Sequence, residues 1–253
     1  MTGLTAAADR PDITAQMLEA LSEVTAATVS MQLLKRGIRR CWIKGPKSLH
    51  APGHVASRRL VGEAFTFRFL PLREDLGTLE SYAREGSIRD AIEALPPGRI
   101  VVIDAQGNQD CATLGDILVA RIKARGGLGV VSDGPLRDVA AVRALDLPVY
   151  CTGATAPPSI AGLVFAGWQE PIGCGGAAVL PGDIIVADED GAVVIPRALA
   201  PEVAEAGLEQ ERFEAYVQLR VEEGAAVKGL YPPDEETLRA YEAWKQSSGG
   251  AAH

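Results

Sequence analysis

The sequence predicts an α/β fold built on a parallel sheet, and three observations carry this prediction. Helical and extended patterns alternate between residues 87 and 151, which is the order typical of β-α-β units. Residues 100–104 form a continuous apolar run, as expected for a strand that is buried on both faces. Residues 184–187 and 192–195 are two short apolar runs joined by Asp188-Glu189-Asp190-Gly191, the pattern of a β-hairpin.

The elements before the alternating region are a helix and a strand. Residues 1–10 are predicted to be a loose tail, and Asp12-Ile13-Thr14 can cap a helix that continues to about residue 36. Its apolar positions recur at helical spacing: Met17, Leu18, Leu21, Val24 and Met31. Residues 61–70 alternate and carry three phenylalanines, which predicts a strand.

The alternating region predicts helices at 87–95, 114–125 and 139–145 and strands at 100–104, 129–132 and 147–151. A last helix is predicted at 201–223, where four apolar side chains lie on roughly one side and are expected to pack on the chain's own core: Leu208, Phe213, Tyr216 and Val217. We therefore expect one domain with helical extensions, divided into residues 1–55, 56–200 and 201–253.

Composition restricts the partners of the chain. Its 253 residues contain 25 Lys and Arg against 33 Asp and Glu, so the net charge is −8 and bulk affinity for nucleic acid or an anionic membrane is not expected. The four cysteines, at 41, 111, 151 and 174, have neither disulfide-framework nor zinc-site spacing. No signal-peptide pattern or membrane-spanning apolar run is present, which predicts a cytoplasmic protein.

Two short motifs bring candidate chemistry to the α/β layer. Gly115-Asp116-Ile117-Leu118 opens a predicted helix, and Arg137-Asp138 follows a Gly-Pro turn after a predicted strand. Twenty residues separate Asp116 from Arg137. This spacing lets the start of the helix and the end of the strand lie at the same edge of the sheet. Because adjacent residues do not face each other on a helix, we expect Arg137 and Asp138 to have different partners. Free N–H groups, a guanidinium and two carboxylates could hold a small keto acid against a divalent metal.

These motifs resemble the pyruvate-aldolase branch of the family named for the regulator of ribonuclease activity A. That branch includes 4-hydroxy-4-methyl-2-oxoglutarate aldolases with oxaloacetate decarboxylase activity. The similarity covers residues 55–200 and continues through Pro181-Gly182-Asp183 and the hairpin. It implies an α/β/β sandwich of the swivelling-domain type, with helical N- and C-terminal extensions. The flanks are similar to those of a longer subgroup.

The resemblance implies a divalent-metal-dependent lyase that cleaves a 4-hydroxy-2-keto acid to pyruvate and also decarboxylates oxaloacetate. Arg137 would bind the keto acid's oxygens and stabilise the enolate, and Asp138 would be the direct metal ligand. Asp116 would hold a water next to the metal, and the N–H groups of Ile117 and Leu118, approached closely at Gly115, would bind the substrate carboxylate. Few protein ligands and many waters favour Mg²⁺ or Mn²⁺ over zinc.

The resemblance also implies a third carboxylate from the C-terminal helix of a neighbouring subunit, and hence a homotrimer or a hexamer. Glu209, Glu211 and Glu214 are candidates and Glu211 is favoured, although each also fits an ordinary solvated helix face.

Two other functions stay open. The family's namesake members bind and inhibit an RNA-degrading endonuclease without catalysis, but the intact Asp116, Arg137 and Asp138 set favours an enzyme. A lyase or hydratase acting on a sugar-derived keto acid is the third reading. His50 and His54 are predicted to lie in a loop, because Pro52-Gly53 interrupts any helix that would align them on a metal.

Overall fold

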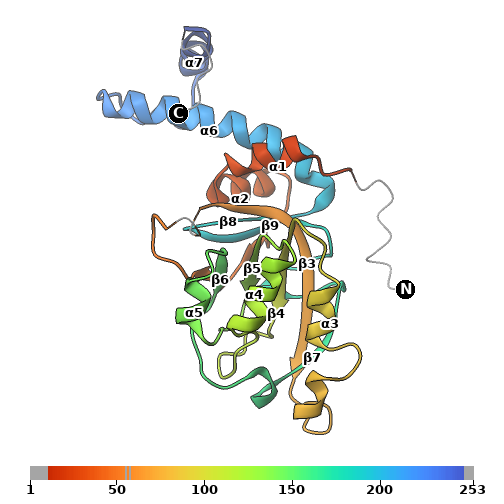
Figure 1. Cartoon of the computed structure of the whole chain (residues 1–253). Coiled ribbons are helices and arrows are strands. Elements are labelled where there is room, and N and C mark those ends of the chain that lie inside the picture. Colours follow the sequence, from red (N-terminus) through yellow and green to blue (C-terminus); the bar gives the residue numbers. More distant parts are fainter. Residues whose placement is uncertain (1–10, 55, 57, 248–253) are drawn as a thin grey trace.

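The computed structural model describes residues 11–54, 56 and 58–247, which form one mixed sheet with helices on both of its outer sides (Figure 1). The sheet order is β1-β9-β8-β3-β4-β5-β6-β2, and β7 also pairs with β3. The strands are β1 (Trp42–Ile43), β2 (Lys47–Ser48), β3 (Leu60–Pro71), β4 (Arg99–Asp104), β5 (Gly129–Ser132), β6 (Val149–Cys151), β7 (Leu163–Trp168), β8 (Ile184–Asp188) and β9 (Gly191–Ile195).

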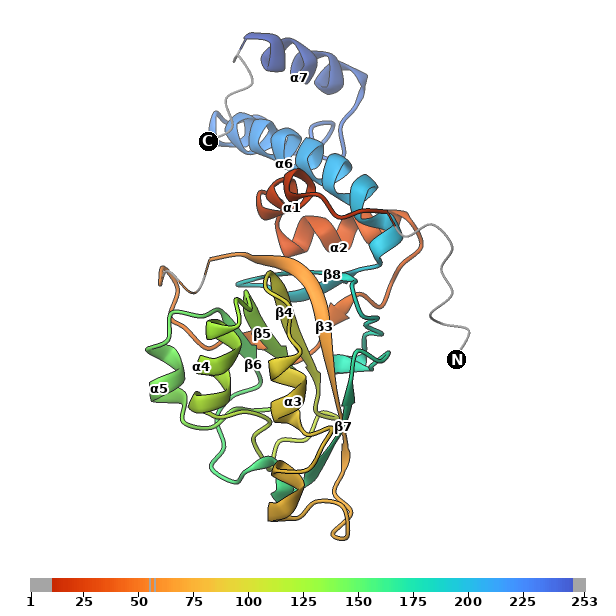
Figure 2. The same ribbon diagram turned by 45° about the vertical axis from the view of Figure 1, so that its right-hand side comes forward.

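The parallel part of the sheet consists of β3, β4, β5 and β6, which confirms the predicted α/β layer. Three short helices cover one face of it: α3 (Ile88–Glu93), α4 (Asp116–Ala124) and α5 (Val139–Arg143) (Figure 2). Phe67, Ile92 and Ile122 are fully buried between these helices and the strands. Burying side chains of this size supplies roughly 1.5–3 kcal/mol each before the entropy of ordering is subtracted.

The hairpin of β8 and β9 makes a second β layer, because its side chains alternate between two cores. Ile185 and Val194 pack with Ile100 and Val102 of the parallel strands. Their neighbours Ile184, Val186, Val193 and Ile195 pack instead against helices from the two ends of the chain. The expected α/β/β sandwich is present, and the terminal helices add a fourth layer.

The first predicted helix is wrong in its extent, because the chain forms two helices there. Thr14 caps α1 (Ala15–Ser22) as expected, but the chain leaves the helix at Glu23 and Thr25 caps α2 (Ala26–Lys35). The Thr25 side chain accepts a hydrogen bond from the N–H group of Thr28, which satisfies a donor that a helix start leaves open. Val24 is fully buried between the two helices and α6 (Ala200–Glu222).

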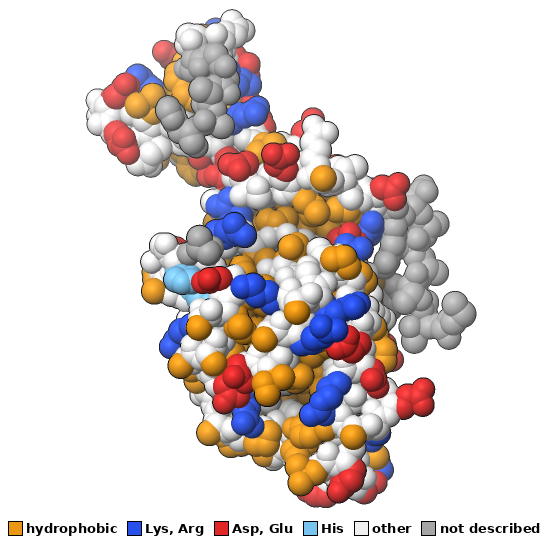
Figure 3. Space-filling view, viewed as in Figure 1, with side chains coloured by type: hydrophobic (Ala, Val, Ile, Leu, Met, Phe, Trp, Pro, Cys, Tyr) orange, Lys and Arg blue, Asp and Glu red, His pale blue; other side chains and the backbone are white. Residues whose placement is uncertain are grey.

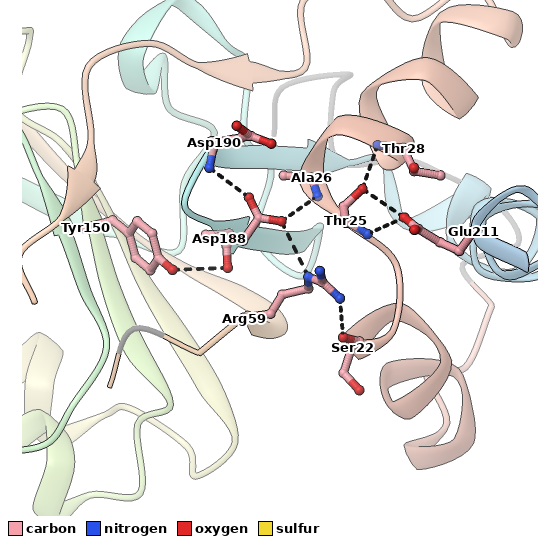
Figure 4. Close-up of polar contacts among 10 residues, drawn as sticks. Ser22, Thr25, Ala26, Thr28, Arg59, Tyr150, Asp188, Asp190 and Glu211 are labelled. Carbon is pink, nitrogen blue, oxygen red and sulfur yellow. Dashed lines mark hydrogen bonds and ion pairs between the residues drawn. The ribbon is translucent and has the colours of Figure 1, made fainter. Parts of the chain in front are cut away.

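A polar network fixes this helical layer to the hairpin (Figure 4). The Asp188 carboxylate accepts from the N–H group of Ala26 at 2.8 Å and lies 3.4 Å from Nε of Arg59. The Arg59 guanidinium in turn donates to the carbonyl of Ser22 at 2.6 Å. One carboxylate therefore ties β8 to the start of α2 and, through Arg59, to the end of α1.

The C-terminal arm contains a helix that the sequence did not predict, α7 (Glu235–Ser247), packed beside the outer end of α6 (Figures 1 and 2). Phe213 and Tyr216 of α6 contact Tyr241 and Trp244 of α7. Most of the apolar stripe predicted on 201–223 is therefore covered by the chain itself. None of the described helices is both long and apolar enough to cross a membrane.

Candidate functional site

The two sequence motifs meet where the parallel strands β4 and β5 end. Parallel strands place their carboxyl ends at one edge of a sheet, and the loops after them lead to α4 and α5. The N–H group of Arg137 donates to the carbonyl of Leu114 at 3.0 Å, and that of Thr113 donates to the carbonyl of Pro135 at 3.1 Å. Backbone hydrogen bonds therefore join the start of α4 to the loop that carries Arg137.

A cavity of about 400 Å³ opens at this edge, and it is lined by six of the seven predicted site residues, all except Glu211: Gly115, Asp116, Ile117, Leu118, Arg137 and Asp138. Other lining residues come from α3 and from the loops around residues 79–82 and 158–160, among them Tyr82, Ile88, Arg89, Ser159 and Ile160. The cavity therefore combines a helix N-terminus, two carboxylates and two guanidiniums with apolar walls.

Arg137 and Asp138 contact each other, so the expectation that adjacent residues would find separate partners is wrong. Nε of Arg137 donates to Oδ2 of Asp138 at 3.1 Å, and both side chains are about 40% exposed. The rule for adjacent helical residues does not apply, because Asp138 precedes α5 in a left-handed conformation with φ 56°. Since Nε holds Asp138, the two terminal nitrogens of Arg137 are left to bind other acceptors.

Gly115 is required for space at this point. A Cβ atom on Gly115 would lie 2.7 Å from Oδ2 of Asp138 and 3.3 Å from Cγ of Arg137. Its backbone has φ −117° and ψ −178°, which any residue can adopt. The absent side chain, rather than unusual backbone freedom, lets Asp138 lie against the start of α4.

We expect Gly115→Ala to fold with a free energy of unfolding within about 1 kcal/mol of the parent chain, because the Asp138 side chain that the new methyl group would meet is 40% exposed and can move. Since catalytic geometry is sensitive to shifts of ~1 Å, the pyruvate release that the family resemblance implies should fall roughly 10- to 100-fold. Gly173→Ala is the matched control, because Gly173 has a similar φ of −117° and a Cβ there would meet nothing within 4 Å. Equal activities of the two variants would contradict the assigned role of Gly115.

The start of α4 presents N–H groups to the cavity. The N–H group of Ile117 donates to Oδ1 of Asp116 at 2.8 Å, whereas the N–H of Leu118 belongs to the first turn and has no acceptor within the helix. The Ile117 side chain is 78% exposed, which is unusual for isoleucine. The helix start can bind an anion, and Ile117 offers an apolar surface at the cavity.

Asp133, directly after β5, binds the loops next to the site through backbone hydrogen bonds. Its carboxylate accepts from the N–H groups of Ala105 at 2.6 Å, Gly107 at 3.2 Å and Gly175 at 2.9 Å. Burial raises the pKa of Asp133, and the hydrogen bonds to Gly175 and Ala105 oppose that rise. Both oxygens serve backbone donors, so this carboxylate has a structural role.

Asp133→Asn should destabilise the fold by about 2 kcal/mol, because the new amide places an N–H₂ group against backbone N–H donors on one side. Urea unfolding followed by circular dichroism would measure the loss. Asp110→Asn, on the exposed loop nearby, should change stability by less than about 0.5 kcal/mol. A variant as stable as the parent would show that the three contacts contribute little.

The donor set fits a hydrated divalent ion better than a fully protein-bound one. Within the described residues no three His, Cys, Asp or Glu side chains come close enough to hold a metal. Asp116 and Asp138 supply two carboxylates, and Mg²⁺ and Mn²⁺ accept such a pair together with waters and substrate oxygens. Tetrahedral zinc would require three or four protein ligands.

The histidines lie in a loop, as predicted, and outside the cavity lining. The rings of His50 and His54 stack with centroids 4.9 Å apart, and Nε2 of His54 is 3.6 Å from Asp146. Burial lowers the pKa of His50. The pair is therefore better explained as packing at the edge strand β2 than as part of the site.

Glu211 does not line the cavity of its own chain. Its Oε1 accepts from both the N–H group and the hydroxyl of Thr25 at 2.8 Å, at the start of α2 (Figure 4). Its contribution to a neighbouring subunit's site stays a prediction.

Sequence reasoning missed Tyr82, Arg89 and Ser159 as cavity residues. The hydroxyl groups of Tyr82 and Ser159 lie 3.2 Å apart, and together they bring residues that are 77 positions apart in sequence to the same wall. No local motif marks them, because their position depends on how two long loops fold over the edge of the sheet.

The family model described as RraA-like, Aldolase/RraA, matches residues 17–194. The chain belongs to the RraA-like family. Its match to "Protein DlpA" of Legionella pneumophila is 31% identical over 67% of this chain and 27% of that protein. A "Putative 4-hydroxy-4-methyl-2-oxoglutarate aldolase" of Halalkalibacterium halodurans is 39% identical over 44% of this chain and 52% of that protein. The chain thus covers only part of the length of both relatives.

Solved structures support the same RraA-like fold. RraAS2 of Streptomyces coelicolor, described as an unusual member of the RNase ES inhibitor RraA protein family, is 34% identical with a TM-score of 0.73 and covers 85% of this chain and 100% of its own. An uncharacterized protein of Pseudomonas syringae is 26% identical with a TM-score of 0.74, over 87% and 99% of the two chains. The proteins similar to this chain therefore include one named as an aldolase and one described as a member of an RNase inhibitor family.

Proposed function

We propose that this RraA-like protein is a divalent-metal-dependent lyase that cleaves a 4-hydroxy-2-keto acid to pyruvate and also decarboxylates oxaloacetate. The observation that carries the proposal is the convergence of Asp116, Arg137 and Asp138 on one cavity at the α4 N-terminus. The aldolase names of relatives at 39% and 35% identity support the same reaction class.

In this proposal Asp138 would hold the ion directly and Asp116 would hold it through a bound water, and the ion would supply Lewis-acid stabilisation of negative charge on the keto oxygen. The substrate carboxylate would lie at the α4 N-terminus and accept from the N–H group of Leu118. The N–H group of Ile117 would join it by exchanging its hydrogen bond to Oδ1 of Asp116 for one to the substrate. The terminal nitrogens of Arg137 donate to the keto oxygen, so that the guanidinium offsets negative charge on this oxygen during the reaction.

In both reactions the C3–C4 bond of the substrate breaks, and its electron pair stays with C3. In the retro-aldol direction the C3–C4 bond breaks, the C4 hydroxyl loses its proton and becomes a carbonyl, and the electron pair forms the enolate of pyruvate. With oxaloacetate the same pair is released as the β-carboxylate leaves as CO₂. Asp116, and Glu211 from a neighbouring subunit, would position the water that exchanges a proton with the substrate; return of a proton to C3 yields pyruvate.

The proposed assembly is a homotrimer, or two trimers paired as a hexamer. It would place α6 of one subunit near the cavity of the next and would cover Ile117, whose side chain is 78% exposed in the single chain. A protein that light scattering finds to be monomeric would remove the role of Glu211.

The second candidate function is inhibition of an RNA-degrading endonuclease by direct contact. It is favoured by the likeness to RraAS2, which covers the whole of that protein at 34% identity. This function needs a protein-binding surface and does not need the carboxylates and the guanidinium of the cavity. A third candidate, a lyase or hydratase acting on a sugar-derived keto acid, would use the same cavity with a different leaving fragment.

Pyruvate release from oxaloacetate by metal-stripped protein, with and without Mg²⁺ or Mn²⁺, separates these functions. We expect release only with metal. If no keto acid yields pyruvate while the protein inhibits such a nuclease at stoichiometric concentrations, the lyase proposal fails and the inhibitor is favoured.

A further inference from the structure

The reacting groups of the proposed site line only one side of the cavity. Asp116 and Leu118 belong to the start of α4, and Arg137 and Asp138 directly precede α5. The other walls come from α3 and from two short 3₁₀ helices, η2 (Leu79–Tyr82) and η3 (Ser159–Ala161). Since α4 lies between α3 and α5 (Figure 2), the cavity continues from the reacting groups toward α3.

The side of the cavity toward α3 is mainly apolar. We call it the apolar half, and it consists of Leu79, Ile88, Pro158 and Ile160 together with the ring of Tyr82. Apolar side chains also lie exposed between charged ones on the face that α3, α4 and α5 form (Figure 3). The Leu79 side chain is 72% exposed although it lines a cavity, so a hydrocarbon group placed against it would remove apolar surface from water.

The polar groups in this wall are bonded to one another. The hydroxyl groups of Tyr82 and Ser159 are hydrogen-bonded at 3.2 Å. The Arg89 guanidinium lies over the Tyr82 ring, 5.0 Å from its centroid, and donates to the Tyr82 carbonyl. Arg89 is also exposed, so its other N–H groups can stay hydrated. A hydrocarbon group can therefore fill the apolar half without leaving a buried polar group unpaired.

The size of the cavity also indicates a ligand larger than pyruvate. Its volume of about 400 Å³ falls in the range of roughly 300–1,000 Å³ that is typical of sites for larger organic ligands. A three-carbon keto acid held by Arg137 and the α4 N-terminus would leave the apolar half empty. The fragment bonded to C3 of the pyruvyl group is the part of the substrate that would reach it.

We propose that the substrates are 4-hydroxy-2-keto acids that carry a hydrocarbon chain on C4, and that the apolar half binds this chain. The inference rests on the proposed lyase function for the reacting end. Cleavage releases pyruvate and an aliphatic aldehyde: the C3–C4 bond breaks, its electron pair stays with C3, which takes up a proton, and the C4 hydroxyl loses its proton to become the aldehyde carbonyl. Oxaloacetate would occupy the reacting side alone.

The test compares 4-hydroxy-2-oxopentanoate, 4-hydroxy-2-oxoheptanoate and 4-hydroxy-2-oxononanoate, which carry a methyl, a propyl and a pentyl group on C4. Each fully buried CH₂ group contributes about 0.8 kcal/mol, which is about fourfold in affinity. Because the cavity is open to water, kcat/KM for pyruvate release should rise about 10- to 200-fold from the methyl to the pentyl substrate. A value that is constant or falls with chain length would overturn the proposal.

Leu79→Ser should lower the ratio of kcat/KM for the pentyl substrate to that for the methyl substrate about 3- to 10-fold, because the chain loses an apolar contact. Leu76→Ser is the matched control, since Leu76 lies on the same loop, is also exposed and does not line the cavity. Its ratio should equal that of the parent. An equal fall in both variants, or in neither, would contradict binding of the chain at Leu79.

Calorimetric binding of 2-oxopentanoate and 2-oxononanoate, which lack the hydroxyl needed for cleavage, separates this proposal from the proposed function. Tighter binding of 2-oxononanoate that depends on Leu79, without turnover of any of the hydroxy acids, would retain the apolar half as a binding site and reject the lyase. Turnover of the hydroxy acids without a preference for long chains would retain the lyase and reject the role of the apolar half.

Discussion

Asp138→Asn should lower metal-dependent pyruvate release at least ~100-fold, because the neutral amide is a poor ligand for Mg²⁺ or Mn²⁺. The backbone should not change, since asparagine tolerates the left-handed conformation that Asp138 adopts at φ 56°. The loss of activity should therefore be accompanied by loss of Mn²⁺ binding in calorimetry, with thermal unfolding near that of the parent chain.

Asp146→Asn is a closely matched control. Asp146 is also exposed, also has a positive φ, of 50°, and also lies beside α5, but it does not line the cavity. This variant should bind metal and release pyruvate like the parent. If Asp138→Asn kept normal metal-dependent release, Asp138 would not be the metal ligand and the proposed site would have to be abandoned.

Arg137→Lys should reduce kcat about 100-fold although the positive charge is retained. A lysine cannot hold Asp138 through Nε and donate two further parallel hydrogen bonds to the substrate at the same time. Removing one donor to a developing oxyanion typically costs 10²–10³ in kcat, so Arg137→Ala should lose at least as much. Steady-state pyruvate release with saturating Mg²⁺ measures both.

Arg121→Lys provides the comparison, because Arg121 lies on α4, is paired with Glu93 and is outside the cavity. Its activity should equal that of the parent. Near-normal turnover by Arg137→Ala would show that this arginine does not stabilise the enolate.

The α/β layer could be predicted from the sequence because its signals are local. The apolar run at 100–104 and the Gly-Gly stop after residue 125 lie within the elements that they define, and β4 and α4 occur where expected. The break after α1 could not be predicted, because the apolar spacing continues through Val24. Only the three-dimensional packing shows that Val24 contacts α6 and that Thr25 starts a second helix.

The candidate site also contains residues that could be predicted from the sequence and residues that could not. Asp116 and Arg137 follow predicted elements at the carboxyl edge of parallel strands, so their convergence could be inferred from topology. The presence of Tyr82, Arg89 and Ser159 in the cavity wall could not be inferred, because no periodic pattern in the sequence places these residues at this edge of the sheet. The Arg137–Asp138 contact was mispredicted because it depends on a left-handed residue, which sequence spacing does not reveal.

The hairpin of β8 and β9 has consequences for how the two ends of the chain can vary. Its outer side chains share one core with Leu21, Val29 and Leu33 from the beginning of the chain and with Val203 and Ala204 from near the end. Side chains from segments about 170 positions apart in the sequence therefore pack against the same side chains in one core. A larger side chain on α2 would need a smaller one on α6, so substitutions at the two ends are expected to be compensatory in related sequences. Grafting either end alone from a relative would bring together surfaces that were never selected to fit.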